Sequence, residues 1–332
     1  MDSSISIIVC VVTAALVFEF INGFHDTANA IATSVYTHAM TAGIAILLAA
    51  GMNFVGALVS EHVAKTITSG LVGIEIEEYV ILAALIGAIL WNLVTWWWGI
   101  PSSSSHALIA SLVGASIVYA MSAQAILWTG VVSKVIIPLF TSPLLGFIIG
   151  FGIMKLLFFS CRHFPLGTVN NIFAKLQIVS AASVAFFHGT NDAQKTMGII
   201  TLTLISAGQL PGDSGVPVWV KIICAATIAF GTSVGGWKIM KTMGKGVTKL
   251  QPPGGFTAQT SSALVIWLMS LLGAPISTTH VITSSVMGVG SAKRLSAVRW
   301  SKAKDILFAW IITLPVCACL GGIVSFIVSQ FI

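Results

Sequence analysis

The sequence predicts an all-α polytopic membrane protein made of two repeats with inverted topology, each containing a discontinuous helix and a re-entrant helical hairpin. Of the 332 residues, 56% are hydrophobic and 8% are charged, whereas soluble domains carry about 25% charged residues. Long apolar runs fill most of the chain, and polar motifs recur in the same order in its two halves. The composition excludes a soluble enzyme.

Apolar runs of helical composition follow one another along the chain and are separated by short polar loops. A helix needs about 20 residues to cross a bilayer, and the runs 5–36 and 176–208 are much longer. Each of these two runs contains a polar, glycine-bearing interruption, so we expect both to form discontinuous helices. The runs cover 5–36, 40–60, 80–100, 107–121, 126–154, 176–208, 218–237, 257–273, 280–290 and 306–332.

The runs 107–121 and 280–290 are short for crossing a bilayer. Each follows a proline-led tract of hydroxyl residues that ends in histidine, PSSSSH at 101–106 and PISTTH at 275–280. We therefore expect re-entrant hairpins over 80–121 and 257–292, with their tips inside the membrane.

The basic residues predict the orientation of the chain. Twelve of the sixteen Lys and Arg lie in three loops, 155–175, 238–256 and 293–305, and such residues concentrate in cytoplasmic loops. The loop 61–78 carries four Glu and one Lys, so we expect it outside, together with both termini. The sequence thus predicts a multi-pass protein of the cell membrane. The five cysteines show no C-x-x-C spacing, so we expect no zinc site and no other cofactor.

Three motifs recur in order along the chain. GFHD at 23–26 matches GTND at 189–192, KTI at 65–67 matches KTM at 241–243, and the first hydroxyl tract matches the second. The KTI and KTM copies lie on opposite predicted sides of the membrane, so the two repeats, 1–154 and 176–332, are inverted and joined by a cytoplasmic linker at 155–175. Inverted repeats with broken helices are typical of secondary transporters that work by alternating access.

Two carboxylates lie at predicted membrane depth, one in each repeat. An ionisable residue there costs at least about 2.5 kcal/mol, so each needs a counter-charge, a cation or a proton. Amide and carboxylate oxygens suit Na⁺, whereas Asp beside His suits a proton relay, and the residues leave both coupling ions open. The candidate coupling-cation residues are Asn22, His25, Asp26, Asn29, Asn191 and Asp192, of which Asp26, Asn29, Asn191 and Asp192 form the candidate Na⁺ set.

The hydroxyl tracts supply candidate anion ligands. Each tract precedes a helix, so its side chains and the first free backbone N–H groups would meet at a helix N-terminus, which favours an anion. Two such termini approaching from opposite sides would enclose a tetrahedral oxyanion, and Lys195 would contact this anion or neutralise Asp192. Glu19 and Lys134 lie in apolar runs with no role assigned. The candidate anion residues are Ser103, Ser104, Ser105, Ser277, Thr278 and Thr279, and the secondary candidates are His106, His188, His280, Thr66 and Thr242.

At these motifs the sequence resembles the inorganic phosphate transporter family (PiT, PHO4), and in particular its low-affinity bacterial branch. NDAQKT at 191–196 is similar to the family's second signature, and NGFHDTANA at 22–30 is similar to the bacterial variant of the first. The resemblance implies uptake of inorganic phosphate by symport, with the tip hydroxyls, Gln194 and Lys195 holding phosphate and the motif Asp and Asn binding the cation. His25 replaces the Asn of the commoner signature, which favours H⁺ over Na⁺.

Two other functions compete with phosphate symport. A sulfate symporter on the same scaffold is the nearest, because the cage would fit either tetrahedral anion, although only phosphate is a proton donor near neutral pH. A membrane-embedded serine hydrolase does not need a duplicated set of residues, so we expect no enzyme. We expect phosphate and membrane lipid as partners and no nucleic acid. The sequence leaves open whether phosphate travels as a metal complex and whether the protein is a homodimer.

Overall fold

The computed structural model describes residues 3–236, 239–240 and 247–331, with the side chains of 3–4 and 27–29 excepted. Helices make up most of this part of the chain, as the apolar runs predict. The main helices are α1 (Ser3–Tyr36), α2 (Ala42–Ala57), α3 (His62–Ser69), α4 (Glu78–Trp98), α5 (Ser104–Ala120), α6 (Trp128–Val131), α7 (Ile137–Ser160), α8 (Leu166–Ser206), α9 (Val218–Val234), α11 (Pro252–Leu271), α12 (Thr278–Lys293) and α13 (Trp300–Val328).

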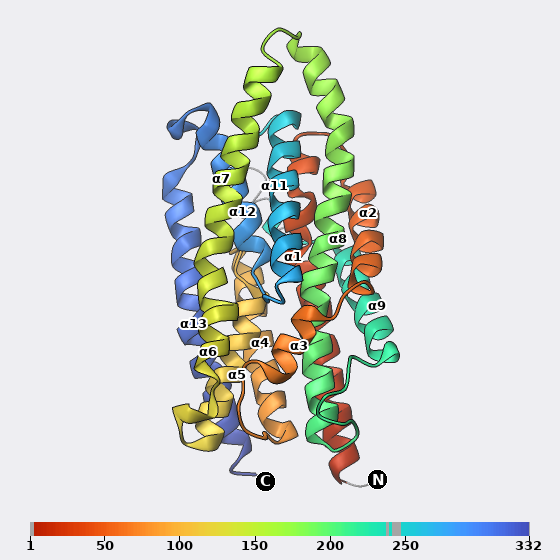
Figure 1. Cartoon of the computed structure of the whole chain (residues 1–332), viewed down its shortest axis with the longest axis vertical. Coiled ribbons are helices and arrows are strands. Elements are labelled where there is room, and N and C mark those ends of the chain that lie inside the picture. Colours follow the sequence, from red (N-terminus) through yellow and green to blue (C-terminus); the bar gives the residue numbers. More distant parts are fainter. Residues whose placement is uncertain (1–2, 237–238, 241–246, 332) are drawn as a thin grey trace.

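The long helices run along the long axis of the molecule, with both chain ends at one end and the α7–α8 turn at the other (Figure 1). Within the described residues, five helices are long and apolar enough to cross a membrane, and a sixth crossing arises if α2 and α3, bent by 65° to each other, form one span. The prediction of an all-α, multi-pass membrane protein is confirmed.

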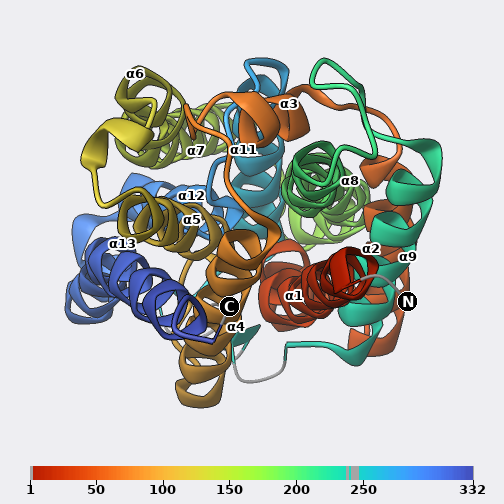
Figure 2. The same cartoon turned by 90° about the horizontal axis from the view of Figure 1, so that it is seen from below.

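Helix α8 lies at the centre of the bundle and contacts α1, α2, α3 and α11 (Figure 2). The pairs α4–α5 and α11–α12 form two hairpins, and α5 packs against α13 as α12 packs against α7. The hairpins enter from opposite ends of the bundle, so their tips meet near its middle (Figure 1). There Ser105 Oγ donates a hydrogen bond of 3.0 Å to the carbonyl of Ile276, and the rings of His106 and His280 lie 5.0 Å apart.

The predicted discontinuity of the two motif helices is wrong. The α1 and α8 helices are continuous through both polar motifs. The motif glycines have another use, because a Cβ on Gly23 would lie 2.6 Å from the carbonyl oxygen of Ile228, and one on Gly189 would lie 2.3 Å from that of Asn53. Glycine therefore allows close contact of α1 with α9 and of α8 with α2, while the helical backbone keeps its own hydrogen bonds.

The segment 155–175, predicted as a linker between the repeats, is mostly helical. Helix α7 extends to Ser160 and α8 begins at Leu166, directly after Pro165. Pro165 has no backbone N–H and a fixed φ, so it interrupts a helix that approaches it but suits the start of the helix that follows. The two long helices thus form a hairpin whose turn is only five residues long.

Candidate functional site

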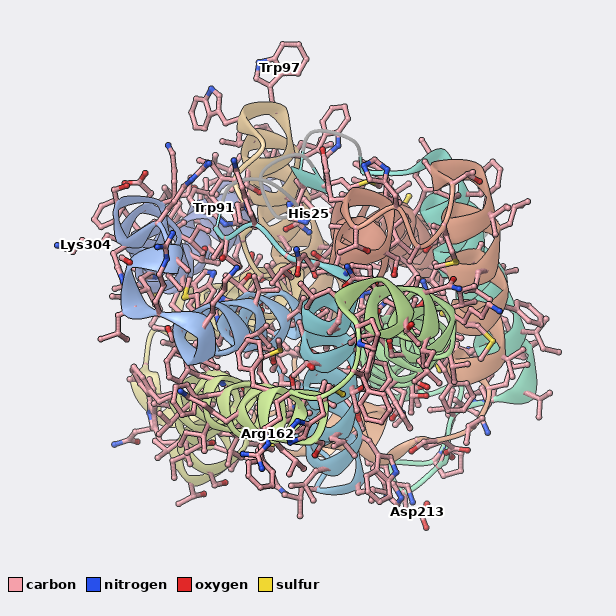
Figure 3. The ribbon with its side chains drawn as sticks, turned by 90° about the horizontal axis from the view of Figure 1, so that it is seen from above. His25, Trp91, Trp97, Arg162, Asp213 and Lys304 are labelled. Atoms are coloured by element: carbon pink, nitrogen blue, oxygen red, sulfur yellow. The ribbon has the colours of Figure 1, made fainter. Side chains whose placement is uncertain are left out.

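The two motif carboxylates meet inside the bundle. Asp26 on α1 and Asp192 on α8 are both buried, and so is His188, one turn before Asp192. One polar atom from each of these three side chains lies within 4.8 Å of the other two. Figure 3 shows His25, the neighbour of Asp26, inside the molecule, whereas Trp97, Lys304 and Asp213 lie at its periphery. Residues 166 positions apart in the sequence therefore form one cluster.

Both hairpin tips donate hydrogen bonds to Asp26. Ser104 Oγ, at the start of α5, lies 2.7 Å from Oδ2, and Thr279 Oγ1, at the start of α12, lies 3.1 Å from Oδ1. Ser104 Oγ is also 2.7 Å from the amide oxygen of Asn22. The carboxylate of Asp26 thus lies between the N-termini of two helices, where the partial positive charge of their free N–H groups favours an anion.

His25 connects this carboxylate to the first hairpin. Its Nδ1 lies 3.0 Å from Asp26 Oδ1, and its Nε2 lies 3.2 Å from Thr95 Oγ1 on α4. Ser102, in the tip, donates to the same Thr95 hydroxyl at 2.8 Å. Because both ring nitrogens have partners, the imidazole is held in one orientation beside Asp26.

Lys195 connects Asp192 to both tips. Its Nζ lies 2.6 Å from Asp192 Oδ1, donates to the Ile276 carbonyl at 3.0 Å and also contacts Ser105 Oγ. The other carboxylate oxygen of Asp192 lies 3.4 Å from His188 Nε2. The lysine side chain is buried, and Asp192 compensates its charge at a point where both hairpin tips also contact the ammonium.

The remaining candidate cation residue on α8 contacts the second hairpin. Asn191 Nδ2 donates to Ser270 Oγ at 2.9 Å and to the Ala274 carbonyl at 3.1 Å. In the described part of the chain its Oδ1 has no hydrogen-bond partner, so this oxygen is available to a cation. The side chain of Asn29 lies outside the described residues.

The predicted anion residues have different hydrogen-bonding roles: two of them cap helices, and one has a hydroxyl without a partner in the described part of the chain. Ser103 and Ser277 accept hydrogen bonds from the backbone N–H groups of His106 and His280, at 3.1 and 3.2 Å, so they cap α5 and α12. The buried hydroxyl of Thr278 has no hydrogen-bond partner among the described residues. This hydroxyl is therefore available to donate a hydrogen bond to a ligand.

Gln194 lies away from the tips. Its amide oxygen accepts from the backbone N–H groups of Val63 and Ala64, at 2.8 and 3.3 Å, at the start of α3. The amide oxygen of Gln194 therefore caps α3, because the first N–H groups of a helix have no partner within the helix. The structure therefore gives no support to Gln194 as a phosphate ligand.

The secondary candidates support the tips. His280 stacks on Trp310 at a ring distance of 3.9 Å, and Thr66 donates to the Gly273 carbonyl at 2.7 Å. Lys134, which had no assigned role, donates to the Leu272 carbonyl at 2.8 Å. These contacts hold the second tip at the end of α11, while Thr242 lies outside the described residues.

Sequence reasoning missed Asn53, a partner of the site, and assigned no role to Glu19. The amide oxygen of Asn53 accepts a hydrogen bond from His188 Nδ1 at 3.0 Å, and its Nδ2 donates to Thr232 Oγ1 at 2.9 Å. Glu19 is fully buried and accepts a hydrogen bond from Thr196. A polar residue inside an apolar run is costly, and that signal alone identifies both Asn53 and Glu19, although it does not predict their partners.

Comparison with known proteins assigns the chain to a family. Residues 22–321 match the family model described as the phosphate transporter family. The chain is 48% identical to a probable low-affinity inorganic phosphate transporter of Bacillus subtilis (strain 168), over 99% of both chains. It is 44% identical to one of Rhizobium meliloti (strain 1021), over 98% of both chains.

A solved structure described as the sodium-dependent phosphate transporter is 27% identical to this chain. It superposes with a TM-score of 0.91 over 98% of this chain and 100% of that one. The fold and the full-length relatives thus agree with the sequence motifs, and the chain belongs to the phosphate transporter family.

Proposed function

We propose that this protein takes up inorganic phosphate across the cell membrane by symport with protons, through alternating access. The observation that carries the proposal is the meeting of Asp26 and Asp192 between the tips of two hairpins that enter from opposite ends. A site shared by two halves is accessible from either side when the halves move relative to each other. The relatives named as phosphate transporters support the substrate.

Phosphate binds between the two tips in this proposal. Its ligands are the hydroxyls of Ser104, Ser105, Thr278 and Thr279 with the ammonium of Lys195. Asp26 is the feature that favours phosphate over sulfate, because phosphate near neutral pH still carries a proton to donate to a carboxylate and sulfate does not. The tip hydroxyls lie 2.7 and 3.1 Å from this carboxylate, so an anion between the tips would face it.

The coupling proton is held by the His25 imidazole, paired with Asp26, so that the carboxylate stays ionised and can accept a hydrogen bond from phosphate. The two side chains are 3.0 Å apart, and an imidazole beside a carboxylate is suited to accept and release a proton. A Na⁺ ion in this cluster would instead use Asp26, Asp192 and the free amide oxygen of Asn191. Proton coupling and Na⁺ coupling therefore predict different driving forces for phosphate uptake by this protein.

Purified protein in liposomes should accumulate phosphate when an inward proton gradient is imposed in the absence of Na⁺. The gradient should lose its effect when a protonophore is added, and excess sulfate should not reduce uptake, because sulfate cannot donate a proton to Asp26. Strict dependence on Na⁺ with no response to the pH gradient would refute proton coupling. Equal competition by sulfate would refute phosphate selectivity.

The chain orientation follows from the same proposal. Figure 1 shows both termini at one end of the molecule and the α7–α8 turn at the other. The described parts of the basic loops, 155–175, 247–256 and 293–305, lie towards the same end as this turn (Figure 1), and Lys and Arg concentrate in the cytoplasm. We therefore place the termini outside the cell and the α7–α8 turn inside, with the two repeats inverted relative to each other.

Single cysteines at Glu77 and at Lys302 should react with a membrane-impermeant thiol reagent from opposite sides. Both side chains are exposed, and the five native cysteines would first be replaced by serine or alanine. In intact cells we expect Glu77→Cys to be labelled and Lys302→Cys to be labelled only after permeabilisation. Labelling of both in intact cells would contradict the inverted arrangement, and the reverse pattern would contradict its orientation.

A further inference from the structure

A basic cavity lies at the end of the molecule that holds the α7–α8 turn. Its volume is about 630 Å³, and its walls come from the ends of α7 and α8, the start of α11 and the connection from α12 to α13. Figure 3 looks down on this end and shows Arg162 beside α7. The cations lining the cavity are Arg162, Lys249, Lys293, Arg294 and Arg299.

Basic side chains dominate the charged lining of this cavity. No carboxylate is among the described residues that line it. The three basic loops contain a single acidic residue, Asp305, whose Oδ2 lies 3.5 Å from Lys302 Nζ. Gly254, in the first turn of α11, also lines the cavity, and a helix N-terminus adds partial positive charge. The cavity is therefore suited to an anionic group.

Apolar side chains of α7, α8 and the turn between them also line the cavity. They are Met154, Leu157, Phe158, Phe164, Leu166 and Phe173. Phe158 is 41% exposed, so the apolar lining continues from the cavity onto the outer surface of α7. A soluble anion would gain nothing from these side chains, whereas the chains of a lipid would cover them.

We propose that this cavity binds the headgroup of an anionic phospholipid of the inner leaflet. The phosphate lies among the cations named above, and the acyl chains pack on Met154, Leu157 and Phe158, along α7 from its C-terminal end towards the bilayer. Basic pockets on the cytoplasmic side of membrane proteins are suited to such headgroups. The cavity shares no lining residue with the phosphate site between the hairpin tips, so this proposal rests on the chain orientation given above and not on the coupling ion.

The test compares two double variants that remove the same charge from the same end of the molecule. Lys293→Gln with Arg294→Gln changes the cavity, whereas Lys155→Gln with Lys175→Gln changes exposed lysines that do not line it. Native mass spectrometry of purified protein would count bound phosphatidylglycerol and, separately, phosphatidylcholine. We expect the unmodified protein and the control variant to retain phosphatidylglycerol preferentially, and the cavity variant to bind it about 30-fold more weakly.

Three outcomes would overturn the lipid site. The first is equal retention of the anionic and the zwitterionic lipid by the unmodified protein. The second is equal weakening in the cavity and control variants, which would mean that binding follows overall charge. The third is displacement of phosphatidylglycerol by glycerol 3-phosphate at comparable concentration, which would identify the ligand as a soluble phosphate ester. Comparable melting temperatures of the two variants would show that neither is misfolded.

Discussion

Asp26→Asn is expected to abolish concentrative phosphate uptake while the protein stays folded and inserted. The amide keeps the size of the carboxylate, and its one oxygen can still accept a hydrogen bond from Ser104 or from Thr279, which lie 2.7 and 3.1 Å from the two carboxylate oxygens. It cannot carry a proton or neutralise a cation at this depth. Internal phosphate should therefore not rise above the external concentration, whatever gradient is imposed, whereas exchange of internal for external phosphate should persist.

The measurement is uptake and exchange of labelled phosphate in proteoliposomes. Asp213→Asn is the matched control, because it makes the same chemical change on an exposed loop at the periphery (Figure 3), and it should retain full accumulation. Accumulation by Asp26→Asn at the level of the control would show that the coupling ion binds elsewhere. Loss of both accumulation and exchange, with an unchanged melting temperature, would assign Asp26 to phosphate binding rather than to coupling.

Removal of one hydroxyl from each tip, by Ser104→Ala with Thr278→Ala, should weaken phosphate binding by about 10²–10⁴-fold. A hydrogen bond to a charged group contributes about 1.5–3 kcal/mol, and two such losses combine to this range. Thr278 Oγ1 has no hydrogen-bond partner within the described residues, so its hydroxyl is free to donate to the anion. Ser104 lies at the same helix position in the first hairpin.

Equilibrium binding of labelled phosphate to the purified protein measures this effect directly. The control is Ser116→Ala with Ser291→Ala, which removes two buried hydroxyls from the same two helices at about 18–20 Å from the tips, given a rise of about 1.5 Å per residue. The control should bind phosphate as the unmodified protein does. If the tip variant also binds normally, phosphate is not held between the tips.

Hydropathy and charge alone were sufficient to predict the membrane class, the all-α fold and the candidate motifs. Apolar composition is a local property, and a bilayer allows an isolated hydrophobic segment few structures other than a helix. The recurrence of GFHD and GTND and of the two hydroxyl tracts likewise needs no tertiary structure to be seen. These features led to the family that the full-length relatives confirm.

The prediction of broken helices failed because a polar or glycine-bearing motif does not by itself interrupt a helix. The backbone hydrogen bonds of α8 are satisfied within the helix, so His188 and Asp192 project from a regular helix into the site. Whether Gly189 breaks a helix or permits a close neighbour depends on α2, whose Asn53 carbonyl occupies the space that a side chain would need. That neighbour is more than 130 residues away in the sequence.

Tertiary structure also decided which polar residues belong together. Lys195 and Gln194 are adjacent in one motif, yet Lys195 reaches Ser105 and Asp192 while Gln194 caps α3. Successive residues of a helix point about 100° apart, so adjacency in a motif does not imply a shared site. The sequence determined which residues must be compensated inside the membrane, and only the packing of α1, α8 and the two hairpins determined which partners compensate them.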